Sequence, residues 1–118
     1  MFKEAAGIKK IVIKTGRTDM RKGISGLASI IQLQNGFDLY EKGTLFLFCG
    51  RKTDRIKGIV FEGDGICMVV KRLSGDNRFQ WPRSAEEVRE ITREQFENLM
   101  EGFTLEGSIR EIKPTDKK

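Results

Sequence analysis

The chain has 118 residues, of which 38% are hydrophobic and 33% charged, and it contains only two prolines. This composition predicts one globular domain with a heavily charged surface and argues against wholesale disorder. The absence of histidine removes the usual near-neutral acid–base group, the Ser–His and Cys–His nucleophile pairs and most zinc ligand sets.

Charge is unevenly distributed along this single predicted domain. The net charge is +5, but the first 83 residues carry 16 Lys and Arg against 8 Asp and Glu, whereas the remainder carries 6 against 9. We therefore divide the chain into a basic body (about 1–83), an acidic helical segment (about 84–103) and a flexible tail (about 107–118). A basic body favours an anionic partner such as nucleic acid.

Targeting signals are missing from the sequence. No signal peptide is evident, and no apolar run approaches the roughly 20 residues that a membrane helix needs. We expect a cytoplasmic protein that binds no membrane. Cys49 and Cys67 each lie within an apolar run and are expected to be buried, reduced thiols.

The first two predicted elements are a strand and a long helix. Residues Ile8–Lys14 are short and β-branched, which predicts a strand. From Asp19 to about Gln34, apolar residues recur at helical spacing and form one face. The members of that face are Met20, Ile24, Leu27 and Ile31.

The start of this predicted helix carries an unusual set of charges. Thr18 and Asp19 are good N-cap residues, yet Arg17, Arg21 and Lys22 crowd an end where the helix dipole is already positive. One interpretation is a bound phosphate that takes the free N–H groups. The other is that Asp19 pairs locally with Arg21 or Lys22, with the remaining charge screened by salt.

Four strand-like runs follow, separated by Gly-Asp and similar turns. They are Thr44–Cys49, Arg55–Glu62, Ile66–Leu73 and Arg78–Trp81. The first is almost wholly apolar and predicts a central strand buried on both faces. Short strands at this spacing predict an antiparallel meander.

The hairpin between the second and third runs concentrates cations. A three-residue loop would place Lys57 opposite Lys71, and a two-residue Asp64-Gly65 loop would place it opposite Arg72; either arrangement is unfavourable by a few tenths of a kcal/mol or more. The charge either binds an anion or forms a solvated edge that discourages aggregation. The predicted nucleic-acid-binding residues are Arg17, Arg21, Lys22, Arg51, Arg55, Lys57, Lys71 and Arg72.

The C-terminal third is predicted to be helical. Ser84 with Glu87, and Thr92 with Gln95, have the spacing of capping boxes. The helical spacing of Phe96, Leu99, Met100 and Phe103 predicts an apolar face that packs on the sheet or on a partner. The predicted fold class is α+β: an antiparallel meander of four to five strands, one long N-terminal helix and a helical C-terminal segment.

Catalytic and metal roles find little support in the sequence. Glu62 and Asp64 flank a tight turn where Asp is common, and Asp54 lies at the far end of the same strand, so a shared metal site is geometrically poor. Trp81 could stack on a base, but an aromatic before a proline at a strand end is more often a core residue. We predict no catalytic residue, no metal and no cofactor.

Four blocks of the sequence together resemble a known family. They are "TDMRKGISGLA", "LFLFCGRKTDRIKGIVFEGDGICMVVKRL", "RFQWPRS" and "REQFENLMEGF", and they span most of the chain. In this combination they resemble the accessory TnpB proteins of the insertion-sequence-66 family of bacterial transposons. Phe61-Glu62 stands where that family usually has Trp-Asp, a change that keeps aromatic and acidic character.

The resemblance implies an accessory role in transposition beside a separate, larger transposase. It supplies no catalytic residues to carry over. We therefore expect a non-enzyme that binds DNA phosphates without strong sequence preference and has the transposase as its partner. One alternative is an adaptor that binds the transposase and never contacts DNA, and a metal-dependent nuclease is a third.

Overall fold

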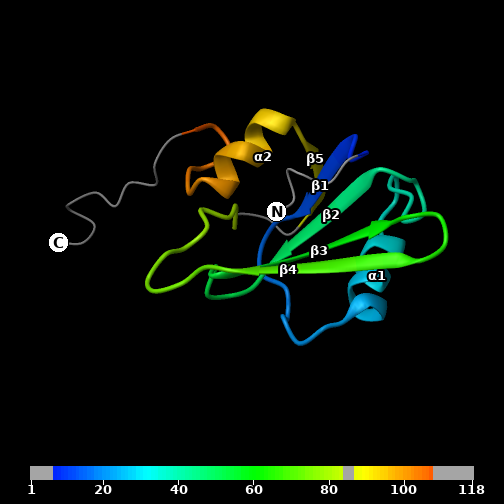
Figure 1. The fold of residues 1–118 in the computed structure, drawn as a ribbon, viewed down its shortest axis with the longest axis horizontal. Helices are drawn as coiled ribbons and strands as arrows, with labels where there is room; N and C mark the ends of the chain where they lie inside the picture. Colours follow the sequence, from blue (N-terminus) through cyan, green and yellow to red (C-terminus); the bar gives the residue numbers. More distant parts are fainter. Residues whose placement is uncertain (1–6, 84–86, 108–118) are drawn as a thin grey trace.

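In the part of the chain that the structure describes, a five-stranded mixed sheet carries one short helix on each face (Figure 1). The computed structural model describes residues 7–83 and 87–107. The elements are β1 (Lys10–Lys14), α1 (Ile24–Gln32), β2 (Thr44–Cys49), β3 (Arg55–Phe61), β4 (Ile66–Arg72), β5 (Val88–Ile91) and α2 (Arg93–Met100). Their order across the sheet is β4-β3-β2-β1-β5. No helix in these two described stretches is long and apolar enough to cross a membrane.

Strand β2 is the centre of the sheet, as its apolar sequence predicts. All six of its residues are buried, with Phe46 and Phe48 facing α1 while Leu45 and Leu47 face α2. The meander is only partly right: β2, β3 and β4 are antiparallel neighbours, but β1 pairs with β2 in parallel. A parallel pair needs a crossover, and the segment containing α1 provides it.

The predicted long N-terminal helix is wrong. The helix α1 has nine residues, and its N-cap is Gly23, which makes no side-chain capping hydrogen bond. Residues 19–23 instead run as a loop before the helix. The predicted apolar face holds only in part within the helix, because Leu27 and Ile31 are buried against the sheet whereas Ile24 is 38% exposed.

The β3–β4 hairpin adopts neither predicted register. Its two central turn residues are Gly63 and Asp64, because the Glu62 N–H donates to the Gly65 carbonyl at 2.8 Å. Gly63 has φ +104°, a conformation that favours glycine. Lys57 therefore lies opposite Val70, and the opposed cations are Arg55 and Arg72.

The C-terminal third combines a strand with a helix. Residues 84–86, which include the predicted cap Ser84, lie outside the described residues, and Val88–Ile91 forms the edge strand β5 where a helix was predicted. Most of the predicted tail, from residue 108, is also outside them. Residues 78–81 form no strand, but Trp81 is buried, and its Nε1 donates to the Lys14 carbonyl at 2.9 Å. Its interpretation as a core residue is confirmed.

Helix α2 follows its local signals. The Thr92 side chain accepts from the Gln95 N–H at 3.0 Å, and the Gln95 side chain accepts from the Thr92 N–H at 2.9 Å, which completes a capping box. Gly102, at φ +92°, follows the end of the helix. Phe96 and Leu99 are fully buried in the core layer between α2 and the sheet. The apolar face therefore packs on the protein's own sheet.

Candidate nucleic-acid interface

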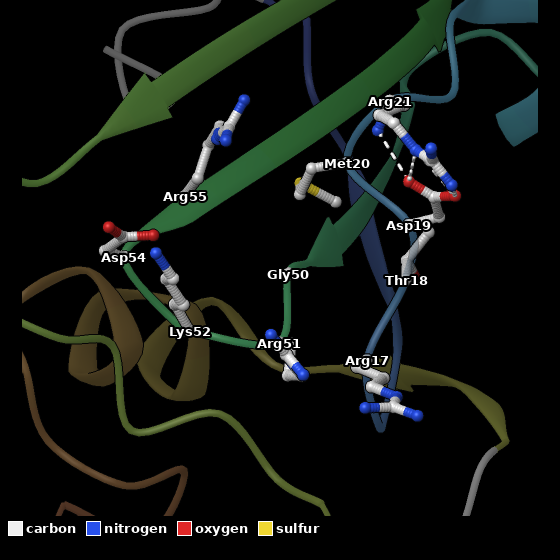
Figure 2. Close-up of a pocket in the computed structure, with 10 residues that line it drawn as sticks. All are labelled: Arg17, Thr18, Asp19, Met20, Arg21, Gly50, Arg51, Lys52, Asp54 and Arg55. Atoms are coloured by element: carbon white, nitrogen blue, oxygen red, sulfur yellow. Dashed lines mark hydrogen bonds and ion pairs between the residues drawn. The ribbon is translucent and has the colours of Figure 1, made fainter.

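A basic cleft lies at the end of the sheet where β1 and β2 both finish. Because these strands are parallel, the segments that follow them, Arg17–Arg21 and Gly50–Arg55, lie together. They enclose a cleft of about 540 Å³ (Figure 2). Its lining residues are Arg17, Thr18, Asp19, Met20, Arg21, Gly50, Arg51, Lys52, Asp54 and Arg55.

Cations dominate the cleft. Five of the ten lining residues are Lys or Arg, and only two are acidic, so the cleft carries a formal excess of positive charge. Figure 2 shows the cationic side chains arranged around Met20 and Gly50. Four of the eight predicted binding residues meet here, and Lys52 joins them. A concave surface of one charge sign focuses the field and attracts ions of the opposite sign.

One of these cations already has an acidic partner. Arg21 forms an ion pair with Asp19, with 2.8 Å between Nη2 and Oδ2, and its backbone N–H donates to Asp19 Oδ1 at 2.9 Å. The Arg21 side-chain hydrogen bond, followed by the backbone one, holds the pKa of Asp19 well below its usual range. The predicted pairing of Asp19 with Arg21 is thus confirmed.

Within the described residues, two polar atoms beside the cleft are buried without a protein partner. They are Thr18 Oγ1 and Arg55 Nε, and the Thr18 residue is only 6% exposed. The backbone N–H of Thr18 is satisfied, because it donates to the Cys49 carbonyl at 2.8 Å. A buried donor without a partner is unfavourable by about 1–3 kcal/mol.

Close packing holds the two walls of the cleft together. A Cβ atom placed on Gly50 would lie 2.6 Å from Met20 Cγ, so only glycine lets Met20 sit there. The same loop holds Thr53 at φ 56°, which is strained for a β-branched residue. The loop is kept in place partly because the Phe79 N–H donates to the Thr53 carbonyl at 2.7 Å.

Three further cations fix the backbone around the cleft. Lys14 Nζ donates to the Arg17 carbonyl at 3.3 Å, and Lys57 Nζ donates to the Lys22 carbonyl at 2.9 Å. Arg83 Nη2 donates to the Arg51 carbonyl at 2.9 Å. The Lys57 and Arg83 hydrogen bonds join residues 35 and 32 positions apart, whereas the Lys14 hydrogen bond is local. Lys57 therefore has a positioning role.

The remaining predicted cations do not line the cleft. Arg72 lies directly opposite Arg55 on the α1 face of the sheet. Lys71 is on the opposite face, with its Nζ 5.9 Å from the centre of the Phe79 ring. Sequence reasoning missed Lys52 and Thr18 as cleft residues. It could have found them only from the parallel pairing of β1 and β2, which brings their two segments together.

Acidic and thiol side chains form no candidate metal site in the part of the chain that the structure describes. Those residues contain no group of three or more Asp, Glu or Cys side chains that could hold a metal ion. Asp54 precedes β3, whereas Glu62 and Asp64 follow it. Cys49 is buried and Cys67 is partly buried, and both are free thiols. Burial raises the pKa of the Cys49 thiol to about 12.

Comparison with known proteins identifies relatives along nearly the whole chain. Residues 9–109 match the family described as IS66 Orf2 like protein. The chain is similar to the uncharacterized protein y4hO of Sinorhizobium fredii, at 33% identity over 106 residues and 90% of each chain. It is also similar to the uncharacterized protein y4jC of the same organism, at 27% identity over 80% of this chain and 79% of the other. No solved structure matches the chain significantly.

Proposed function

We propose that this chain, which belongs to the IS66 Orf2-like family of transposition accessory proteins, binds the phosphate backbone of nucleic acid through its basic cleft. The observation that carries the proposal is the convergence of five cations in one cleft. A phosphate would relieve the repulsion among these cations through charge-assisted hydrogen bonds.

Binding of this kind is non-specific. Lys and Arg side chains that reach only phosphates position a protein on nucleic acid and contribute little sequence discrimination. If about four to six cations engage, affinity falls by roughly 10²- to 10³-fold between 50 and 200 mM salt, because counterions are released on binding.

A pair of matched variants tests the cleft. Arg51→Ala with Arg55→Ala removes two cleft cations, whereas Lys9→Ala with Lys42→Ala removes two exposed lysines near the opposite end of β1 and β2. The two variants have the same net charge. Fluorescence anisotropy on labelled duplex and single-stranded DNA measures affinity across a salt series.

We expect the cleft variant to reduce the slope of log affinity against log salt by about 2, and the control to leave it nearly unchanged. Equal slopes for the two variants would show that only net charge matters and would reject the cleft. Absence of binding by folded wild-type protein at 50 mM salt would also reject it, and would favour the adaptor role.

The protein is proposed to act without catalysis. The cleft contains two carboxylates, and Asp19 is committed to Arg21. The test is incubation of the pure protein with supercoiled plasmid and Mg²⁺ or Mn²⁺. Nicking that persists through purification and disappears in an Asp54→Ala variant would establish a nuclease instead.

The proposed protein partner is the transposase of the same element, and the acidic side of α2 is the proposed contact. Glu94, Glu97 and Glu101 are exposed at spacings of three and four residues, while the apolar side of this helix is buried against the sheet. Charge reversal at these three glutamates should abolish co-purification with the transposase and leave DNA affinity unweakened. Unchanged co-purification would exclude this surface.

A further inference from the structure

The outer edge of β4 is the longer of the two sheet edges. β4 has seven residues and ends the sheet on one side, whereas β5 on the other side has four. Among the described residues, no strand pairs with this outer edge. A long apolar edge strand is a template for another strand, and proteins commonly protect such edges.

The hydrogen-bonding pattern shows which backbone groups face outward. The Glu62 N–H donates to Gly65, and the Leu73 N–H donates to Asp54, both at 2.8 Å, so even-numbered β3 residues and odd-numbered β4 residues form the hydrogen-bonded pairs. The N–H and C=O groups of the even-numbered β4 residues therefore point away from β3. These residues are Ile66, Met68, Val70 and Arg72.

The side chains along this edge are apolar until its last two residues. Ile66, Cys67, Met68 and Val69 are partly buried, and Val70 is 45% exposed. Lys71 and Arg72 follow at one end, while Glu62 and Asp64 lie in or beside the turn at the other end. The edge therefore has an acidic end, an apolar centre and a basic end.

We infer that this edge pairs with the same edge of a second copy of the chain. In an antiparallel arrangement with its two-fold axis at Val69, Arg72 lies opposite Ile66 of the second copy and Val70 lies opposite Met68. All four outward residues are then hydrogen-bonded, with about eight main-chain hydrogen bonds in the complete ladder.

Charge complementarity selects a second copy as the occupant. The antiparallel arrangement places Lys71 and Arg72 of each chain beside the acidic turn of the other, with Asp64 diagonal to Arg72. The exposed Val70 gains an apolar neighbour. An interface whose two halves are the same patch, complementary to itself, is the type found in two-fold symmetric dimers. This inference is independent of the proposed DNA binding.

Cysteine cross-linking tests both the dimer and its register. In a Cys67→Ser background, Val69→Cys places two thiols at the two-fold axis, in a non-hydrogen-bonded pair close enough for a disulfide. Val70→Cys is the matched control, because its equivalents lie diagonally at about 7–8 Å. We expect disulfide dimers on mild oxidation with cysteine at position 69 and few with cysteine at position 70. Cross-linking at position 70 alone would overturn the proposed register.

A proline variant tests the ladder without a new thiol. Met68→Pro removes an outward N–H that β3 does not use, and circular dichroism checks that the fold is retained. We expect the dissociation constant of the dimer, measured by analytical ultracentrifugation, to rise at least tenfold. As a second variant, Val70→Lys adds like charge near the axis and should have the same effect. A wild-type chain that is monomeric at every concentration, or dimers unaffected by both variants, would overturn the inference.

Discussion

Two segments of this protein have a hydroxyl residue before a helical pattern, and only one of them starts a helix there. At Thr92 the side chain caps α2, and Gln95 completes the box. At Thr18 the side-chain oxygen has no partner, and the helix starts after Gly23 instead. The two sites differ in the residue three positions later. The Gln95 side chain accepts a hydrogen bond from the Thr92 N–H, whereas the Arg21 side chain has no acceptor atom.

Tertiary contacts account for the rest of the difference. The Thr18 N–H is used by Cys49, Met20 packs against Gly50, and the Lys22 carbonyl accepts from Lys57. These contacts hold the segment as a loop and leave polar atoms unpaired beside a cleft. A helix start whose polar groups all bond within the helix has a structural role. A predicted helix start whose polar groups bond to distant segments is a candidate binding site.

The largest effect is expected from Gly50→Ala, which breaks the contact between the cleft walls. Its Cβ would overlap Met20 Cγ, so the loop must move, and overpacking of this kind destabilises by about 1–3 kcal/mol. Urea denaturation measures the change in the free energy of unfolding. Met20→Ala in the same chain should recover part of the loss. An additive double variant would show that the two residues do not interact.

A smaller effect separates the two threonines. Thr92→Ala should reduce the free energy of unfolding by about 1 kcal/mol, the usual contribution of an N-cap side chain. Thr18→Val keeps the side-chain shape and removes only an unpartnered hydroxyl, so stability should be unchanged or slightly higher. Thermal unfolding of both variants compares them directly. A larger loss for Thr18→Val would reveal a structural role for its hydroxyl.

The next effect concerns the charge inside the cleft. Asp19→Asn frees Arg21 and removes one negative charge, so nucleic-acid affinity should rise by about two- to fivefold, as expected for an exposed pair. Anisotropy titration at neutral pH measures it. Because its pKa is lowered, Asp19 in the folded protein stays ionised below its usual pKa of 3.8, and its contribution to stability is lost progressively as the pH falls through 3.8 toward the lower folded-state pKa. Unchanged affinity would place Arg21 outside the binding surface.

The two thiols should differ in reactivity. Their ionisation should have the smallest effect on stability at neutral pH. Cys67 should react readily with iodoacetamide, while Cys49 should react only as the protein opens. Mass spectrometry follows both, and Gly50→Ala should accelerate the labelling of Cys49. Because burial raises the pKa of Cys49 from 9.0 to about 12, the folded state keeps a proton that the unfolded state releases. Stability should therefore fall as the pH rises above about 9.

Local patterns in the sequence were sufficient for the elements that depend on near neighbours. The apolar run of β2 predicted a strand buried on both faces, the Thr92–Gln95 spacing predicted the start of α2, and Trp81 was assigned to the core. Each of these properties depends on side-chain periodicity or on groups a few residues apart. Four of the five cleft cations could be named for the same reason, because they cluster along the chain.

Only the tertiary structure decided which clusters meet. The parallel pairing of β1 with β2 brings residues 17–21 beside residues 50–55, and the turn at Gly63-Asp64 sets Arg55, not Lys57, opposite a cation. The segment that begins at Asp19 has a helical pattern, but contacts with Gly50, Cys49 and Lys57 hold its first residues as a loop. Pairing between distant segments depends on how much apolar surface the whole fold buries, a quantity that no short stretch of sequence contains.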